Sequence, residues 1–186
     1  MNHTTTRLKV EPEEVASANG SASLSRAYPT GRAIQPLEFR HALGRFATGV
    51  SIVTTECDGQ IHGMTANAFV SISLDPPLVL LSLDNRSHMH QILPKTGRYG
   101  VSVLAEGQES LSNHFAGRKV EDPDFKFITR MDTPLLEGAL AYFVTQVIDI
   151  HPAGDHTLYI AKVNHFECCE GRPLVYFAGR YQRVGP

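Results

Sequence analysis

The stretch from Met64 to Leu83, MTANAFVSISLDPPLVLLSL, constrains the fold of this chain more than any other segment. It opens with small and hydrogen-bonding residues, continues with alternating apolar and polar side chains, and turns at Pro76–Pro77 into an apolar run. Alternation is typical of a strand with one buried face, and a continuous apolar run is typical of a strand buried on both faces. The stretch therefore predicts two neighbouring strands, the first of which presents backbone and short polar groups at its edge.

Strand-like segments dominate the rest of the chain, and the turns between them are too short for repeated crossover helices. This pattern favours an antiparallel barrel over a doubly wound parallel sheet. The predicted strands cover residues 48–55, 61–74, 78–83, 99–104, 140–151, 156–166 and 174–177, and the predicted short helices cover 36–47, 87–93 and 109–115. Pro94 is expected to end the second helix. The predicted fold is mainly β with a few short helices.

The 186 residues suffice for one domain with an ordinary core, and 42% hydrophobic and 19% charged residues are typical of a globular protein. A net charge of −2 without any basic run argues against nucleic-acid binding. No apolar run is long enough to cross a bilayer, and the N-terminus lacks a signal-peptide pattern, so we expect a cytoplasmic protein. Residues 1–34, rich in Ser, Thr, Ala, Glu and Gly, predict a mobile tail before an ordered domain over 35–186.

Several common chemistries have no motif in this sequence. The three cysteines show no C-x-x-C spacing, and no recognised metal-ligand pattern occurs, so no metal site is expected. There is also no G-x-G-x-x-G after a predicted strand and no G-x-x-x-x-G-K. If the protein uses a nicotinamide nucleotide, it does not hold it in a Rossmann unit.

The segment GMTAN, from Gly63 to Asn67, has the composition of a seat for a flat heteroaromatic ring. Such a ring needs N–H and hydroxyl donors at its edge, which Thr65 and Asn67 offer. It also needs small residues, such as Gly63 and Ala66, that let the backbone approach closely. The alternative is an ordinary bent strand with small residues at a barrel corner.

A helix is predicted to begin at Ser87, with Ser87 as its N-cap and His88 in its first turn. The free N–H groups of such a turn favour a phosphate, and Arg86 and His88 could add charge beside it. Because this helix follows the strand after GMTAN, the ring seat and the phosphate seat could lie within the length of one mononucleotide. The alternative is a plain N-cap that binds nothing.

Two later segments also carry candidate binding groups. Arg118 and Lys119 follow the third predicted helix and either meet the same phosphate or are solvated surface charges. His156, in the sequence Gly154-Asp155-His156, lies between two long predicted strands at the lip of the sheet. A histidine there could contact an amide or a phosphate, or be a turn residue exposed to water.

Together these segments resemble the flavin reductase-like family, the small reductase partners of two-component aromatic hydroxylases and related monooxygenases. The resemblance covers roughly Leu37 to Val184 and is carried by ATGVSIVTT, GMTANAFVSISLDPPLVLLSL, the helix start at Ser87, NHFAGR, GDHTLYIAKV and PLVYFAGRYQRV. It implies an FMN-binding split β-barrel, usually a homodimer with two flavin sites near the interface. It also implies an NAD(P)H-dependent flavin reductase, in which hydride passes from nicotinamide C4 of NADH or NADPH to N5 of FMN or FAD. The reduced flavin then reaches a separate flavin-dependent oxygenase.

The resemblance also implies roles for individual residues. The flavin-binding positions would be Met64, Thr65, Ala66 and Asn67 along the ring and ribityl chain, Ser82 at the ribityl region, Ser87 and His88 at the phosphate, and Arg118. His156 would contact the nicotinamide as the catalytic residue, and Tyr181 would close that pocket. Ala68 stands where family members commonly have serine, which removes one hydroxyl contact.

Two other functions suit the same barrel. A pyridoxamine-phosphate-oxidase-like oxidase would hold a phosphate-bearing substrate in a pocket rich in Arg and Lys, and these segments carry few cations. A non-catalytic flavin-binding or sensor protein would need no nicotinamide contact, so the turn that contains His156 favours turnover. No cluster of Arg and Lys adjoins that turn, which favours NADH over NADPH, although Lys162 and Arg180 could approach it in the fold.

Overall fold

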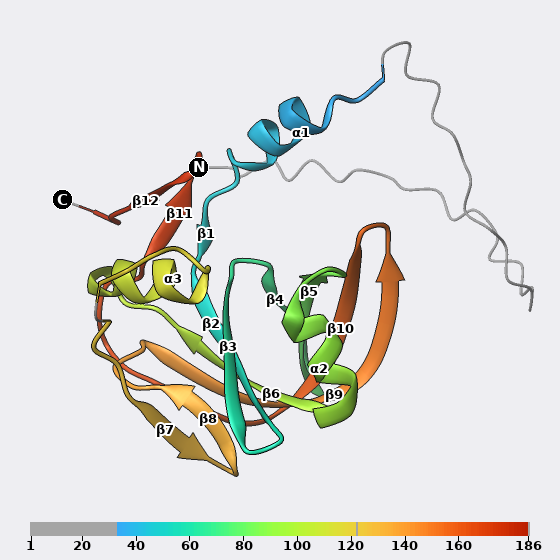
Figure 1. The fold of residues 1–186 in the computed structure, drawn as a ribbon, viewed down its shortest axis with the longest axis vertical. Coiled ribbons are helices and arrows are strands. Elements are labelled where there is room, and N and C mark those ends of the chain that lie inside the picture. Colours follow the sequence, from blue (N-terminus) through green and yellow to red (C-terminus); the bar gives the residue numbers. More distant parts are fainter. Residues whose placement is uncertain (1–32, 122, 186) are drawn as a thin grey trace, which may run out of the picture. The chain divides into compact units, whose positions relative to one another are not determined.

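The computed structural model of the protein describes residues 33–121 and 123–185 (Figure 1). The chain divides into two units, Met1–Ile34 and Gln35–Pro186, and the elements described below belong to the second. The predicted mobile tail over residues 1–34 lies almost wholly outside the described residues, so it stays a prediction.

Strands make up most of the regular structure, which confirms the prediction of a mainly β fold with a few short helices. The helices are α1 (Pro36–Leu43), α2 (His88–Thr96) and α3 (Glu109–Phe115), with the 3-10 turn η1 (Glu106–Gln108) before α3. The strands are β1 (Thr48–Gly49), β2 (Ser51–Cys57), β3 (Gln60–Ala66), β4 (Phe69–Leu74), β5 (Pro77–Asp84), β6 (Arg98–Val103), β7 (Phe127–Arg130), β8 (Thr133–Leu136), β9 (Ala141–Ala153), β10 (His156–Cys168), β11 (Val175–Phe177) and β12 (Arg180–Gln182).

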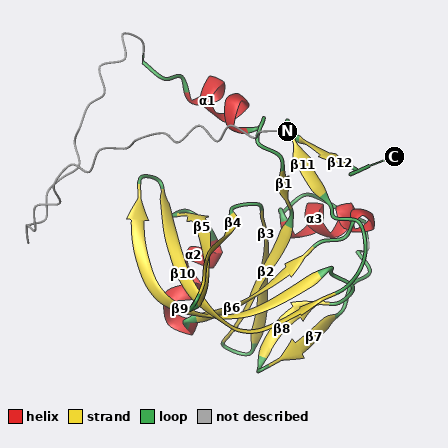
Figure 2. Cartoon of the chain, turned by 180° about the vertical axis from the view of Figure 1, so that it is seen from behind, coloured by secondary structure: helices red, strands yellow, loops and turns green. Residues whose placement is uncertain are grey.

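Seven strands form one antiparallel sheet in the order β3-β2-β6-β9-β10-β5-β4, so β3 and β4 are its edges (Figure 2). These two edge strands are nevertheless consecutive in the chain, since β3 ends at Ala66 and β4 begins at Phe69. A flat seven-stranded sheet would hold its edges about 29 Å apart, whereas the three peptide units between these residues reach only about 11 Å. The sheet must therefore curl until its edges approach each other, which leaves a split between β3 and β4.

The inner side of the curled sheet is filled by apolar side chains and by one face of α2. This cluster contains Val53, Ala66, Val79, Leu81, Leu83, Met89, Leu93, Tyr99, Val101, Tyr159 and Ala161. The prediction that β5 is buried on both faces is wrong, because Leu78, Leu80 and Ser82 alternate with its core residues and are only half-buried. The outer face of β5 is thus available to position polar groups.

A short hairpin, β7–β8, covers part of the outer side of the sheet and is missing from the predicted elements. Leu135 and Leu136 of β8 are fully buried against neighbouring strands. The close approach requires Gly100 in β6, because a Cβ there would lie 2.6 Å from the carbonyl oxygen of Pro134. Four-residue strands, one of them with an internal proline, give too weak a pattern for a prediction.

Helix α2 continues through Pro94 to Thr96, so the predicted stop at Pro94 is wrong. Pro94 has no N–H for the carbonyl of His90, four residues earlier. The Tyr159 hydroxyl, from β10, lies 3.3 Å from that carbonyl oxygen and 2.8 Å from Nδ1 of His90. A side chain from the sheet thus occupies the place of the missing helix hydrogen bond.

The remaining differences from the predicted elements lie at their ends. The predicted strand over 61–74 is two strands, because the chain crosses the split at residues 67–68. The predicted last strand corresponds to β11, and a turn with Ala178 and Gly179 at positive φ leads back into β12. The first helix ends at Leu43, whereas α3 has its predicted bounds.

Candidate functional site

Strand β3 presents its residues alternately to the core and to the outside of the sheet. Met64 and Ala66 pack in or against the core cluster, whereas the Thr65 hydroxyl donates to the Ser112 carbonyl of α3 at 2.6 Å. Asn67 follows, exposed, where the chain crosses between the sheet edges. Among the four predicted ring-seat residues, Thr65 and Asn67 therefore direct side chains outward, and Met64 and Ala66 have only backbone groups to offer there.

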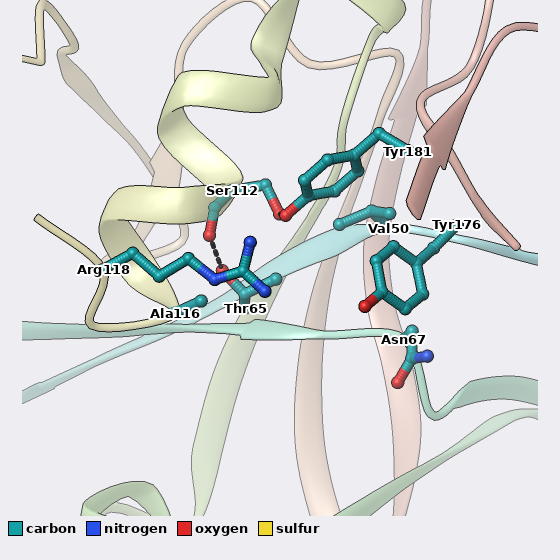
Figure 3. A pocket seen from close by; sticks show the side chains of 8 residues that line it. All are labelled: Val50, Thr65, Asn67, Ser112, Ala116, Arg118, Tyr176 and Tyr181. Carbon is teal, nitrogen blue, oxygen red and sulfur yellow. Dashed lines mark hydrogen bonds between the residues drawn. The ribbon is translucent and has the colours of Figure 1, made fainter. Parts of the chain in front are cut away.

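A pocket of about 180 Å³ lies beside β3, α3 and the β11–β12 hairpin (Figure 3). Its lining residues are Val50, Thr65, Asn67, Ser112, Ala116, Arg118, Tyr176 and Tyr181. Figure 3 shows the two tyrosine rings entering from one side and the Arg118 side chain from the other. The pocket therefore combines two aromatic rings, one cation and several short polar groups, and it contains four of the predicted site residues.

Hydrogen bonds fix the polar side of this pocket. The Tyr181 hydroxyl lies 2.8 Å from Ser112 Oγ and donates to Asn113 Oδ1 at 3.3 Å. Nη1 of Arg118 donates to the same Asn113 oxygen at 2.9 Å. Ser112 is fully buried, and its carbonyl also accepts from Thr65. The network joins α3, β3 and β12 and holds the guanidinium group of Arg118.

Helix α3 can lie against β3 because Gly63 has no side chain. A Cβ at Gly63 would lie 2.7 Å from Cε1 of Phe115, which belongs to α3. Gly63 thus makes room for the helix, in addition to any freedom that it gives the backbone next to a ligand. Ser112 and Tyr176 escaped the sequence analysis, because a single serine in a short helix and a tyrosine in a strand carry no distinguishing signal.

Ser82 lies in the C-terminal part of β5, next to the split in the sheet. Its amide donates to the Ala68 carbonyl at 3.0 Å, and its side chain lies on the half-exposed outer face of β5. Just beyond this strand Ser87 caps α2, and its Oγ accepts from the His90 amide at 3.2 Å, which confirms the predicted N-cap. Polar groups therefore follow one another from Asn67 through Ser82 to Ser87, and we call this series the β5 strip.

His88 is exposed in the first turn of α2, and its ring meets that of His62 edge to face with 5.2 Å between ring centroids. His62 was missed by the sequence analysis, although strand alternation puts it on the same face of β3 as Met64. Arg86 is held by Asp84, with Nη2 2.7 Å from Oδ2 and Nε 3.1 Å from Oδ1. These bonds keep the pKa of Asp84 well below its usual range.

His156 begins β10 and lies opposite Asp84 of β5 in the register of the sheet. Its Nδ1 is 2.7 Å from Oδ1 of Asp155, and this hydrogen bond lowers the pKa of Asp155. The side chain is 43% exposed, so the ring can still reach a ligand. Since Ser82 and Asp84 share the outer face of β5, His156 lies beside the C-terminal end of β5, across that strand from the Asn67 crossing.

The structure gathers the predicted side chains into two groups. One group, Thr65, Asn67, Arg118 and Tyr181, lines the pocket. The other, Ser82, Ser87, His88 and His156, lies along β5 and the start of α2. Tyr181 and His156 belong to segments that lie apart within one chain, because β12, which carries Tyr181, is at the left of Figure 1 and the β9–β10 turn, which His156 follows, is at its right.

Other surface features hold none of the predicted residues. A hollow of about 420 Å³ between α3 and the segment before β7 includes Asp124, Lys126 and Glu137. Within residues 33–121 and 123–185, no three His, Cys, Asp or Glu side chains are grouped as a metal ion would require. No helix in this part of the chain is both long and apolar enough to cross a membrane.

Comparison with known proteins relates most of the chain to one family. The family model described as a flavin reductase-like domain matches residues 43–185. An NADH-dependent flavin reductase from a Rhodococcus species is 50% identical over 154 residues, which are 81% of this chain and 88% of that protein. The reductase component of 4-hydroxyphenylacetate 3-monooxygenase from Thermus thermophilus is 40% identical over 147 residues, which are 78% of this chain and 95% of that protein.

Solved structures show the same similarity. The flavin reductase PheA2 in its native state aligns with a TM-score of 0.80 and 40% identity, covering 82% of this chain and all of that one (100%). An NADH:FAD oxidoreductase from Streptomyces globisporus, in complex with NAD and FAD fragments, aligns with a TM-score of 0.76 and 33% identity over 83% of this chain and 98% of that one. The family match spans both groups of predicted residues.

Proposed function

This chain belongs to the flavin reductase-like domain family, and from that premise we propose that it is an NADH-dependent flavin reductase that supplies reduced FMN or FAD to a separate monooxygenase. The β5 strip is the observation that carries the proposal. It brings the exposed Asn67 amide and the capped turn at Ser87 together at the C-terminal end of β5, with His156 on the neighbouring strand. A mononucleotide with a flat ring and a phosphate has the complementary shape.

The donor set of the β5 strip fits a flavin. The ring edge of a flavin carries carbonyl oxygens and ring nitrogens, which the Asn67 side chain and the backbone at the split can meet. The first turn of α2 offers free N–H groups to a phosphate. The adjoining pocket, at about 180 Å³, is smaller than the roughly 300–1,000 Å³ of whole-ligand sites. It would take one ring or side group, while the rest of the ligand lies along the strip.

When bound, the flavin and NADH supply the hydride chemistry themselves. The residues of this chain bind and orient. Asn67 and Ser82 would hold the ring edge and the ribityl chain, Ser87 and His88 the phosphate, and His156 the nicotinamide. Arg118 and Tyr181 would add a cation and an aromatic ring at the pocket. Their task is to stack the two reacting rings at about 3–3.5 Å, which requires no general acid or base.

We also propose a homodimer, which is supported by the apolar residues of α1. Not one residue of α1 is buried in the single chain, and Leu37, Phe39 and Leu43 are 81%, 53% and 58% exposed. An eight-residue helix is not stable in water without a packing surface. A second copy of the chain would supply that surface, and it would also give the separated Tyr181 and His156 a partner across the interface.

The direct test of the proposed function is spectrophotometric. Purified protein is mixed with NADH or NADPH, with and without added FMN or FAD, and the loss of absorbance at the nicotinamide band is followed. We expect flavin-dependent oxidation that is faster with NADH, because no Arg–Lys cluster adjoins the β9–β10 turn to receive a 2′-phosphate. Tight flavin binding without oxidation of either nucleotide would instead identify a flavin-binding or sensor protein.

The partner oxygenase is supported by relatives whose names describe reductase components of monooxygenases. Adding such an oxygenase and its aromatic substrate to the reductase should couple NADH oxidation to hydroxylation. The cytoplasmic location, where NADH is plentiful, stays a prediction from the sequence.

A further inference from the structure

We propose that Asp155 is a positioning residue that holds the His156 imidazole with its proton on Nδ1, so that Nε2 meets the nicotinamide carboxamide as a hydrogen-bond acceptor. The inference deepens the proposed function and rests on it. It specifies that His156 accepts the hydrogen bond from the nicotinamide, and it names Asp155 as the residue that makes His156 an acceptor.

The proton is located by the chemistry of the pair. An ionised carboxylate can only accept hydrogen bonds. The bond to His156 lowers the pKa of Asp155, so this carboxyl group is ionised near neutral pH. With Oδ1 of Asp155 at 2.7 Å, Nδ1 of His156 must be the donor. In a neutral imidazole the second nitrogen then has a free lone pair, and Nε2 is an acceptor.

The surroundings of His156 leave this role to Asp155. Asp84 lies opposite His156 in the sheet, but both of its oxygens are engaged by Arg86. Arg86 lies near both carboxylates, and its side chain is paired with Asp84. Within the described residues, Asp155 makes the hydrogen bond that fixes the ring of His156.

The backbone of the turn is itself held in place. The Asn85 amide donates to the Asp155 carbonyl at 3.0 Å, and the Thr157 hydroxyl donates to Oδ1 of Asn85 at 2.7 Å. These bonds join the β9–β10 turn to the segment that leads into α2. The backbone that carries Asp155 is therefore held in place, although the Asp155 side chain is 87% exposed.

The carboxamide of nicotinamide has an N–H₂ group, which an unprotonated Nε2 can receive. If the proton moved to Nε2, the ring would present a donor to that N–H₂ group and the hydrogen bond would be lost. Asp155 should therefore affect recognition of the nicotinamide and leave flavin binding alone. The wrong tautomer is the expected result when asparagine replaces such an aspartate, because its amide can donate to Nδ1.

The test compares Asp155→Asn with Asp149→Asn. Asp149 is a matched control, because it also pairs with an exposed histidine, His151, at 2.9 Å, and its residue is likewise exposed. We expect the KM for NADH to rise about three- to tenfold in Asp155→Asn, the worth of one hydrogen bond, with kcat and flavin affinity little changed. Asp149→Asn should match the wild type.

Two further measurements separate positioning from a general structural effect. With an NADH analogue in which an acetyl group replaces the carboxamide, no N–H₂ group is present, so wild type and Asp155→Asn should have equal KM values. Nitrogen-15 NMR of the imidazole should show Nδ1 protonated in the wild type and a shift toward Nε2 in the variant.

An unchanged KM for NADH in Asp155→Asn, an equal loss with the acetyl analogue, or protonated Nε2 in the neutral wild-type ring would overturn the inference. These results presuppose a wild-type protein that oxidises NADH in the presence of flavin. If it does not, the proposed function and this inference fall together, whereas normal wild-type turnover with any of the three results overturns the inference alone.

Discussion

Asn67 and Met64 belong to the same short motif, but the structure gives them different surroundings. The alternation of β3 sends Met64 into the core, whereas Asn67 lies where the chain leaves β3 to cross the split. Asn67 belongs to neither strand, so no residue of a neighbouring strand is paired with it. Its side-chain amide is therefore available to a ligand. Within GMTAN, Met64 therefore contributes to the core, whereas Asn67 offers a side chain to a ligand.

Replacing Asn67 with leucine should weaken flavin binding about tenfold or more, because the ring edge loses a hydrogen-bonding partner and meets an apolar branch. Fluorescence titration with FMN and with FAD measures the dissociation constant. Asn164→Leu is the matched control, since Asn164 is also exposed but lies on β10 away from the crossing. Normal flavin affinity in Asn67→Leu would show that the ring lies elsewhere.

Replacing His156 with alanine should raise the KM for NADH about tenfold while flavin affinity stays within about twofold. The ring lies on β10 beside the C-terminal end of β5, and its loss removes a nicotinamide contact without changing a residue of the split. Steady-state kinetics at saturating flavin measure the effect, with His151→Ala as control because His151 is a second exposed histidine on the same hairpin. Unchanged kinetic constants in His156→Ala would remove this residue from the site.

At the scale of elements, hydrophobic periodicity identified the long strands and helices α2 and α3, because each buries a regular face, and it also identified α1, whose apolar residues are exposed in the single chain. Helix α3 and the N-cap at Ser87 follow local rules of capping and termination, and both were predicted correctly. The continuation of α2 past Pro94 depends on Tyr159, which is sixty-five residues later in the chain, so no local rule reveals it. The β7–β8 hairpin likewise depends on Gly100 and the buried surface that it meets.

Replacing Tyr159 with phenylalanine should lower the free energy of unfolding by about 1–2 kcal/mol. The His90 carbonyl would lose its donor next to Pro94, and Nδ1 of His90 would lose its neighbour. Urea unfolding followed by circular dichroism measures the change. Tyr99→Phe is the control, because the buried Tyr99 hydroxyl has no hydrogen-bond partner among the described residues. Equal stability of wild type and Tyr159→Phe would show that the hydroxyl does not support α2.

For the whole molecule, the decisive feature is that consecutive strands form the two edges of one sheet. This connection forces the sheet to curl, and it places the Asn67 crossing beside Ser82, near the C-terminal end of β5 that leads to α2. The sequence predicted the barrel class from its runs of consecutive strands with short turns. It did not predict that β12, which carries Tyr181, and the β9–β10 turn, which His156 follows, lie at opposite sides of the view in Figure 1, because their separation depends on the path of the last two hairpins.

A dimer built on α1 should dissociate when the apolar face of that helix is made charged. We expect size-exclusion chromatography with light scattering to give twice the chain mass for the wild type and a single chain mass for Phe39→Glu combined with Leu43→Glu. Arg40→Glu changes charge on the same helix without removing an apolar side chain and should remain dimeric. A wild type that runs as a single chain would contradict the proposed assembly.

The central claim is that the Asn67 crossing and the capped turn at Ser87 bind one flavin. A crystal of the protein soaked with FMN or FAD tests it most directly. We expect density for the tricyclic ring against residues 65–68, for the ribityl chain past Ser82, and for a phosphate at the first turn of α2. Ring and phosphate density at any other place, with both of these positions empty, would contradict it.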